Sequence, residues 1–168
     1  MRTALILIVL FFGCGCGGGG GAGAVAPSVN AGADQSAAGP TITLTGNADA
    51  TAVVWTQVSG PAPARFATPS AASGRVDLPL VGSYTFRLSG WRGSHVVADT
   101  VTITVTGTGT TIAGTVEDDA AAAAARVELQ WRDGFAILDT ATAPDGTFAV
   151  GGLAGVPGDY RIVVRGTP

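Results

Sequence analysis

The stretch Thr100-Val101-Thr102-Ile103-Thr104-Val105 decides the fold expected of this chain. Its apolar residues occupy every second position. Successive side chains of a β-strand point to opposite faces, so one face of this segment would be buried and the threonine face would be solvated. The same alternation appears at 41–44 and 85–88, and Thr, Val and Ile suit a pleated surface. Turn residues interrupt these segments about every eight to twelve positions, which predicts an all-β protein made of antiparallel β-sandwiches.

The chain is expected to divide into two tandem sandwiches. Residues 107–110 carry no large side chain and are predicted to be a linker between a sandwich at 27–106 and a smaller one at 111–168. The run of alanines at 120–125 has a helix-like composition, but six residues fall short of the ~12 that an isolated helix needs. The second sandwich is small, so its hydrophobic core alone would give it only marginal stability. We therefore expect it to pack against the first sandwich.

Aromatic side chains on the apolar faces are the candidate structural core. Trp55 shares a strand face with Val53 and is predicted to fill the space between two sheets. Tyr84 and Phe86 alternate inward on a later strand. In the second sandwich the candidate core aromatics are Trp131, Phe148 and Tyr160, and the apolar face of the last strand continues to Val164.

The N-terminus has the pattern of an export signal. Arg2 precedes an apolar run at 4–12, which is too short to span a hydrocarbon core of roughly 30 Å and fits a signal peptide over residues 1–13. The run ends at Gly13-Cys14-Gly15-Cys16. Residues 14–26 are almost entirely Gly and Ala, a composition that predicts a flexible tether.

The segment Phe11-Phe12-Gly13-Cys14 resembles the lipobox of bacterial lipoproteins. This resemblance implies lipid attachment at Cys14, with Cys16 as the alternative. It places the protein outside the cytoplasm, anchored to the outer membrane or cell surface. Cleavage after Ala24, within the A-x-A pattern at 22–24, would instead release a secreted protein.

The residue inventory argues against an enzyme. All nine basic residues are Arg, so Schiff-base chemistry on Lys is excluded. His95 is the single histidine, and both cysteines lie in the N-terminal segment, so neither a His-rich zinc site nor a thiol nucleophile is expected beyond it. No cofactor is expected. A formal net charge of −3 disfavours nucleic acid as a partner.

Five blocks in the first half resemble polycystic-kidney-disease (PKD) type domains over about 27–106. They are Ala31-Gly32-Ala33-Asp34-Gln35, Leu44-Thr45-Gly46, Trp55-Thr56-Gln57-Val58-Ser59-Gly60-Pro61, the block at 82–88 and the block at 99–105. The resemblance implies an immunoglobulin-like sandwich, found outside cells as a spacer or adhesion module. Some members bind calcium, which makes Asp34, Asp49 and Asp99 candidate ligands, although this chain has fewer carboxylates than the family pattern. Alternatively, Asp34 and Asp99 accept backbone N–H bonds in turns.

The second half resembles carboxypeptidase regulatory-like, or prealbumin-like, domains. The resemblance rests on Ile112-Ala113-Gly114-Thr115-Val116, on 125–129, on Asp145-Gly146-Thr147-Phe148 and on 158–164. It implies a non-catalytic β-sandwich appendage. The acidic group at 117–119 is expected to be a solvated loop, because adjacent acids on a strand point to opposite faces.

Three functions remain open at this point. The leading hypothesis is a lipid-anchored cell-envelope protein that acts as a structural or adhesive spacer and whose partners are the membrane and an envelope protein or polysaccharide. The first alternative is a carbohydrate-binding module that uses Trp91, which is expected at a hairpin tip beside Arg92; against it, Trp91 would pack on neighbouring loops. The second alternative is an accessory subunit of an envelope enzyme or complex.

Overall fold

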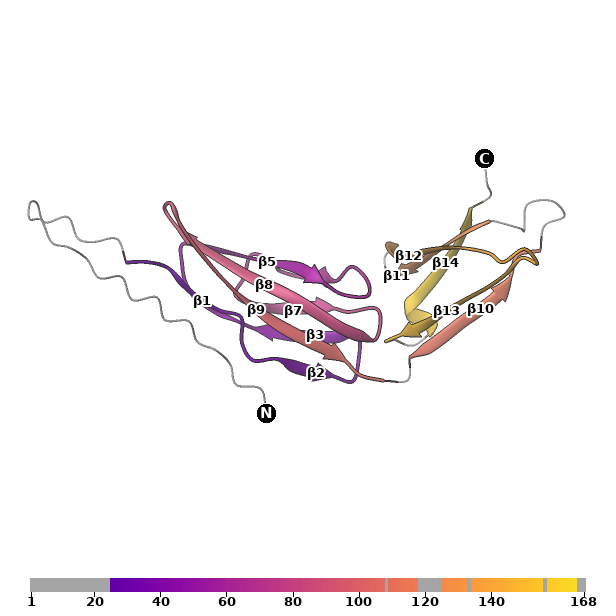
Figure 1. Ribbon diagram of the computed structural model, residues 1–168, viewed down its shortest axis with the longest axis horizontal. Helices are drawn as coiled ribbons and strands as arrows, with labels where there is room; N and C mark the ends of the chain where they lie inside the picture. The colour runs from indigo at the N-terminus through magenta and orange to yellow at the C-terminus, as the bar shows by residue number, and fades with distance from the viewer. Residues whose placement is uncertain (1–24, 108, 118–124, 133, 156, 166–168) are drawn as a thin grey trace, which may run out of the picture.

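The chain folds into two β-units placed end to end (Figure 1). The structure is a computed structural model that describes residues 25–107, 109–117, 125–132, 134–155 and 157–165. Strands β1 to β9 form the first unit and β10 to β14 the second. The predicted all-β sandwich fold is confirmed.

The first unit packs a four-stranded sheet against a three-stranded one. The larger sheet has the order β2-β9-β8-β5, and the smaller has the order β3-β7-β6. A separate two-stranded sheet pairs β1 with β4. The strands are β1 (Ser28–Asn30), β2 (Gln35–Ala37), β3 (Thr41–Thr45), β4 (Asn47–Asp49), β5 (Ala52–Ser59), β6 (Arg65–Phe66), β7 (Ser73–Asp77), β8 (Gly82–Arg92) and β9 (His95–Val105).

One strand pair departs from the antiparallel arrangement that the sequence predicted. Strand β2 runs parallel to β9, with Gln35 opposite Ile103. The Asp34 carboxylate accepts the N–H of Thr102 at 2.7 Å, and the carbonyl of Ala37 accepts the N–H of Thr106 at 2.7 Å. Bonds before and after β2 therefore fix its register, and the chain then crosses to the other sheet as β3.

The core of the first unit lies between its two larger sheets. Trp55 on β5 is 3% exposed, and its indole N–H donates to the carbonyl of Ala72 at 3.1 Å. Tyr84, Phe86 and Leu88 of β8 are all fully buried, and they alternate with residues that face outward. The period-two pattern thus places the large aromatic residues between the sheets, because their burial removes the most apolar surface from water.

The second unit is a smaller sandwich. A three-stranded sheet of order β12-β11-β14 accompanies the two-stranded sheet β10-β13. Leu129 and Trp131 on β11 are fully buried. The strands are β10 (Thr110–Thr115), β11 (Arg126–Trp131), β12 (Phe135–Ala141), β13 (Thr147–Leu153) and β14 (Tyr160–Arg165), and the 3₁₀ turn η1 (Pro157–Asp159) precedes β14.

Three apolar residues expected on the inner face of the second unit are less buried than the pattern predicted. Phe148 and Tyr160 are half-buried, and Val164 is 46% exposed. Phe148 covers Gly114 on the neighbouring strand, where a Cβ would lie 2.9 Å from its ring. Tyr160 and Val164 lie on β14, at the edge of the three-stranded sheet, and the two-stranded sheet opposite covers only part of that sheet. Phe148 lies on the two-stranded sheet itself, and nothing in the structure explains its partial exposure. Alternation shows which face a residue occupies, whereas the amount of opposing surface decides how deeply it is buried.

Candidate functional site at the junction of the two units

The two units are joined by β-type backbone hydrogen bonds as well as by the connecting chain. Leu80, in the segment between β7 and β8, forms an antiparallel bridge with Leu153 at the end of β13. The N–H of Val81 donates to the carbonyl of Gly152 at 2.8 Å, and the N–H of Ala154 donates to the carbonyl of Pro79 at 2.9 Å. These bonds tie the 79–81 segment to the second unit and limit rotation about the connecting chain.

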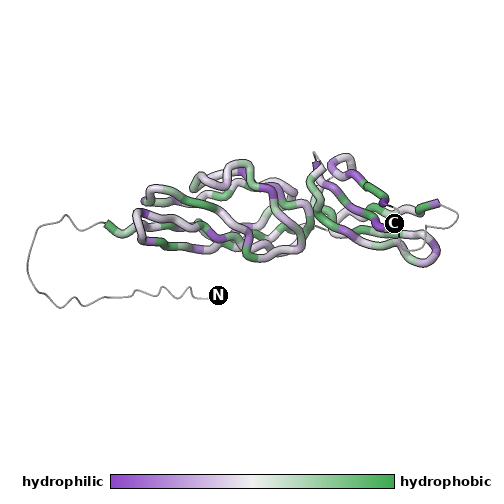
Figure 2. Tube along the Cα trace, turned by 90° about the horizontal axis from the view of Figure 1, so that it is seen from above, coloured by the Kyte–Doolittle hydropathy of each residue, from purple (hydrophilic) through white to green (hydrophobic). Residues whose placement is uncertain are grey.

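An apolar cluster continues across this junction. Leu80 and Ala62, both from the first unit, are buried within the hydrophobic cluster of the second unit beside Trp131 and Leu153. In the opposite direction, Ala154 packs against the core of the first unit. Figure 2 shows apolar segments of both units meeting at the junction. The second unit therefore completes its core with residues of the first, consistent with its small size.

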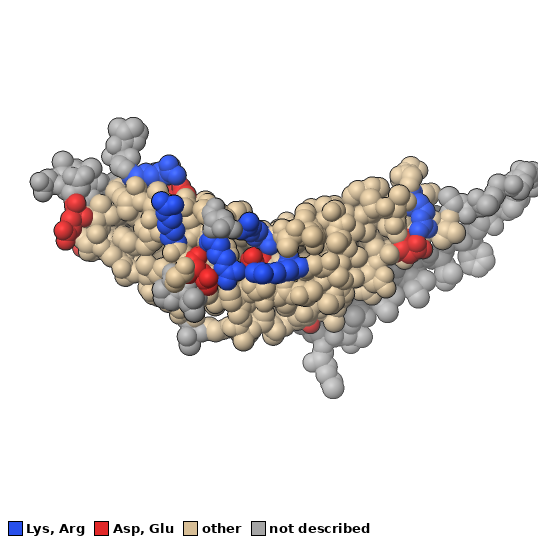
Figure 3. Space-filling view, turned by 180° about the vertical axis from the view of Figure 1, so that it is seen from behind, with Lys and Arg blue, Asp and Glu red and all other residues tan. Residues whose placement is uncertain are grey.

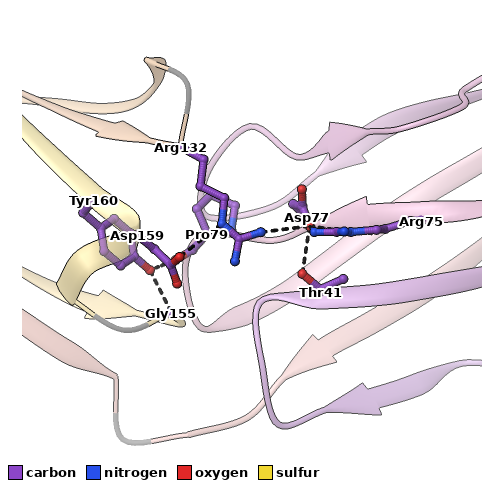
Figure 4. A network of polar contacts seen from close by, with 8 residues as sticks. All are labelled: Thr41, Arg75, Asp77, Pro79, Arg132, Gly155, Asp159 and Tyr160. Atoms are coloured by element: carbon purple, nitrogen blue, oxygen red, sulfur yellow. Dashed lines mark hydrogen bonds and ion pairs between the residues drawn. The ribbon is translucent and has the colours of Figure 1, made fainter.

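The Tyr160 side chain crosses the junction. Its hydroxyl donates to the carbonyl of Pro79 at 2.8 Å and accepts the N–H of Gly155 at 2.8 Å (Figure 4). Burial raises the pKa of Tyr160 above its ordinary value, which keeps the hydroxyl protonated and able to donate. Tyr160, expected to be a core residue, is therefore a half-buried contact between the units.

A charged network borders the same junction, with Arg132 at its centre (Figure 4). The Nε of Arg132 lies 3.2 Å from Oδ1 of Asp159, and its Nη1 lies 3.9 Å from Oδ1 of Asp77 in the first unit. Its guanidinium also covers the Trp131 ring, 4.7 Å from the ring centroid. Asp77 additionally accepts bonds from Thr41 Oγ1 at 2.8 Å and from Arg75 Nη2 at 2.9 Å.

The backbone of Arg132 also has an uncommon conformation. Its φ is 21°, and among the described residues it is the one non-glycine with a positive φ. Side chains other than glycine rarely adopt this region, and such conformations persist where the surroundings hold them. Here the N–H of Arg132 donates to the carbonyl of Asp159 at 3.0 Å, and its carbonyl accepts the N–H of Phe135 at 3.1 Å.

Two adjacent cavities lie on either side of Arg132. The first, of about 390 Å³, is lined by Arg65, Phe66, Ala67, Arg75, Asp77 and Arg132. The second, of about 350 Å³, is lined by Arg132, Gly134, Gly158, Asp159, Tyr160 and Arg161. The sequence provided no signal for this grouping, because its members come from separate strands and turns of both units.

The structure places Trp91 near a hairpin end but not at its tip. The residue lies in β8, one residue pair before the Arg92–His95 pair that closes the β8–β9 hairpin. It is half-buried, on the opposite sheet face from Leu88, and it is paired with Ala52 and with Val96, which is 67% exposed. His95 is exposed at the start of β9.

The three candidate calcium ligands have other partners. Asp99 accepts the N–H of Ala31 at 2.8 Å, Asp34 accepts that of Thr102, and Asp49 pairs with Arg92. The Asp34 and Asp99 bonds join segments 68 residues apart, so these carboxylates connect strands rather than close local turns. Within the described ranges, no group of three or more His, Cys, Asp or Glu side chains is placed to hold a metal ion.

The export and lipidation predictions fall on residues 1–24, which include Cys14, Cys16 and Ala24 and lie outside the described residues. The same applies to Asp118 and Asp119, whereas their neighbour Glu117 is described and exposed. Across the described ranges, no helix is long and apolar enough to cross a membrane.

The similarity of the whole chain to known proteins is low. No curated protein sequence matches the chain. Two solved structures with low similarity are a β-glucuronidase 3 from Bacteroides uniformis and the TIE protein of Bacillus anthracis. The first has 10% identity and a TM-score of 0.32, with 84% of this chain and 25% of that chain covered. The second has 13% identity and a TM-score of 0.31, with 88% and 36% covered.

A family model described as "K319L-like, PKD domain" matches residues 31–105. This range runs from the residue after β1 to the last residue of β9, so it covers most of the first unit. The match agrees with the blocks around Trp55 and Val101 that carried the resemblance in the sequence. The chain therefore contains a PKD-type domain at residues 31–105.

Proposed function

We propose that this chain is a non-catalytic, lipid-anchored protein of the cell envelope in which the two β-units act together as a stiff spacer. The observation that carries the proposal is the junction. The Leu80–Leu153 bridge, the shared apolar cluster around Trp131 and the Tyr160–Pro79 bond all oppose bending between the units. A PKD-type domain, which is common in extracellular proteins, and the signal-like N-terminus support a position outside the cytoplasm.

A distance measurement between the units tests the stiffness. Spin labels are placed on cysteines at Val96 and Leu138, which are 67% and 37% exposed, after Cys14 and Cys16 are changed to serine. We expect a narrow distribution of label-to-label distances by pulsed electron resonance. Leu80→Asp, which places a charge inside the shared cluster, should broaden it. A broad distribution in the protein with Leu80 intact would contradict the spacer role.

The lipid anchor is tested by the intact mass of protein extracted from membranes. We expect the mass of the chain without residues 1–13 plus acyl chains at Cys14. Two or more chains are needed for stable attachment, since a single chain binds only marginally. Cys14→Ser should release the protein from the membrane fraction, whereas Cys16→Ser should not. A mature chain that begins at Val25 without lipid would show secretion instead.

A second candidate function is carbohydrate binding at Trp91. The observation in its favour is that Trp91 lies half-buried on the outer face of its sheet beside the exposed Val96. A flat aromatic ring at such a surface can stack on a sugar face. Polysaccharide pull-downs of the unaltered protein and of Trp91→Ala test this role, and equal retention of both would dismiss it.

A further inference from the structure

The arginines of this chain are unevenly distributed over its surface. Four of the nine line the two cavities at the junction: Arg65, Arg75, Arg132 and Arg161. The carboxylates that line the same cavities are Asp77 and Asp159. The junction therefore has two more positive than negative charges, although the whole chain has a formal charge of −3. Figure 3 shows Arg side chains, with Asp and Glu side chains among them, gathered around the middle of the molecule where the two units meet.

The guanidinium groups retain capacity for another anion. Each Arg carries five N–H donors in a planar fork that matches a carboxylate or phosphate. Arg75 uses Nε and Nη2 on a single oxygen of Asp77, and Arg132 is shared between Asp159 and Asp77. The side chains of Arg75 and Arg132 are 52% and 35% exposed. Water, or a ligand in its place, can thus reach both groups.

The arrangement of the cavities favours an extended ligand. Arg132 lines both of them, so acidic groups spaced along one molecule could occupy both sides of it. Single ion pairs at exposed sites are weak, and useful affinity therefore requires several such pairs from one ligand. A polymer with repeated acidic groups meets this requirement, whereas a single small anion does not.

The residues that line the two cavities also limit the class of polymer that can bind there. Phe66 is the aromatic residue of the first cavity; it is half-buried and its ring packs edge-to-face on Phe86 at 5.3 Å, which leaves only part of the ring available to stack on a base. In the second cavity, Tyr160 is half-buried and its ring packs edge-to-face on Trp131, with 4.8 Å between the ring centroids. A sugar polymer needs no stacking surface here, because its acidic groups can bond to the guanidinium forks.

We propose that the arginine-lined junction binds an acidic polysaccharide through the carboxylate or phosphate groups on successive sugars. Arg65 and Arg75 from the first unit and Arg161 from the second provide the charged walls, with Arg132 between them. The proposal does not depend on the lipid anchor. It differs from sugar stacking at Trp91 because its ligand must be charged.

Affinity electrophoresis of the purified chain tests this site with polygalacturonate, a carboxylate polymer, and with glycerol-phosphate teichoic acid, a phosphate polymer. Fully methyl-esterified polygalacturonate is the uncharged control. We expect retardation by at least one charged polymer, none by the ester, and weaker retardation as salt rises. Retardation by neither charged polymer, or equal retardation by the ester, would overturn the proposal. Tighter binding to DNA than to both polymers would also overturn it.

Matched variants localise the binding. Arg65→Gln with Arg75→Gln should weaken it roughly tenfold. Arg87→Gln with Arg126→Gln removes the same charge away from the junction and should have little effect. Equal losses in the two double variants would indicate diffuse attraction and contradict the site.

Asp77→Asn provides an independent check if the first double variant fails to fold. This substitution removes the negative charge that occupies Arg75 while the side chain keeps its shape. Binding should tighten severalfold. Unchanged or weaker binding in a folded Asp77→Asn protein would count against the proposal.

Discussion

The two buried tryptophans, Trp55 and Trp131, differ in the hydrogen bonding of their indole N–H groups. Trp55 donates its indole N–H to the carbonyl of Ala72, whereas Trp131 Nε1 is fully buried and, among the described residues, has no hydrogen-bond partner. An unbonded buried donor costs free energy of folding. The Trp131 ring contributes instead through its contacts with Tyr160, 4.8 Å between centroids, and with Arg132.

This contrast predicts different costs for the same substitution. Trp55→Phe leaves the Ala72 carbonyl without its donor, whereas Trp131→Phe removes a donor that had no acceptor. Both variants lose ring volume, so Trp55→Phe should lower the free energy of unfolding by about 1 kcal/mol more than Trp131→Phe. Urea unfolding of the two full-length variants measures the difference. Equal costs would mean that the Trp55–Ala72 bond adds nothing.

A buried tyrosine makes the first unit sensitive to alkali. The Tyr84 hydroxyl donates to the carbonyl of Leu80 at 3.0 Å and accepts its N–H at 3.1 Å, and burial raises the pKa of Tyr84 to about 12. The unfolded chain loses this proton near pH 10, before the folded chain does. The resulting stabilisation is complete below pH 10 and is lost as the pH rises toward 12.

Unfolding by urea at a series of alkaline pH values should show this loss. We expect a decrease of about 2–3 kcal/mol between pH 10 and 12. Tyr84→Phe should be less stable at neutral pH, because the Leu80 groups lose their partner, and should have a flatter profile above pH 10. Tyr160 adds a further decrease in the same direction, since its pKa is also raised. An identical slope in Tyr84→Phe would rule out Tyr84 as the cause.

At the scale of elements, the connection into β10 depends on close backbone contact. Gly109 has a φ of +66°, and a Cβ at this position would lie 2.7 Å from the Cα of Gly152. Gly93, in the β8–β9 turn, has a similar φ of +60°, but nothing lies within 4 Å of its Cβ position. Both positions favour glycine for its backbone freedom, but only Gly109 also needs the missing side chain.

Alanine substitutions separate these two requirements. Gly93→Ala should cost about 1 kcal/mol from backbone strain alone. Gly109→Ala should cost about 2–4 kcal/mol, because it also pushes β10 away from Gly152 and disturbs the neighbouring Val81–Gly152 bond. Thermal unfolding compares the costs, and amide exchange at Val81 reports on the bond. Similar costs at both positions would show that the close contact relaxes easily.

At the scale of the whole molecule, the core of the second unit includes side chains of the first unit. Its apolar cluster includes Leu80 and Ala62 from the first unit, and the strand end at Leu153 is hydrogen-bonded to the 79–81 segment. Removal of the first unit would expose this surface to water and leave the Pro79 partner of Tyr160 missing. The units are therefore expected to unfold together.

A fragment of residues 110–168 tests this dependence. We expect poorly dispersed amide resonances and no sharp melting transition, whereas the full chain should melt in one cooperative step. Leu80→Asp in the full chain should weaken the coupling and split the melt into two steps. A sharp, high-temperature transition of the isolated fragment would show that the second unit is self-sufficient.

The sequence by itself determined several of the strands and which of their faces is apolar. Alternation around Val101, Trp55 and Phe86 predicted both, because an apolar side chain at every second position can be buried only on one face of a strand. The blocks around Trp55 likewise indicated the PKD-type domain. Only the tertiary structure decided the parallel β2–β9 pair, the partial exposure of Tyr160 and Val164, and the Arg132–Asp77 junction. These features depend on which distant segments of the chain meet and on how much surface those segments cover. The alternation of side chains along one strand does not determine its distant partners or the area that they cover.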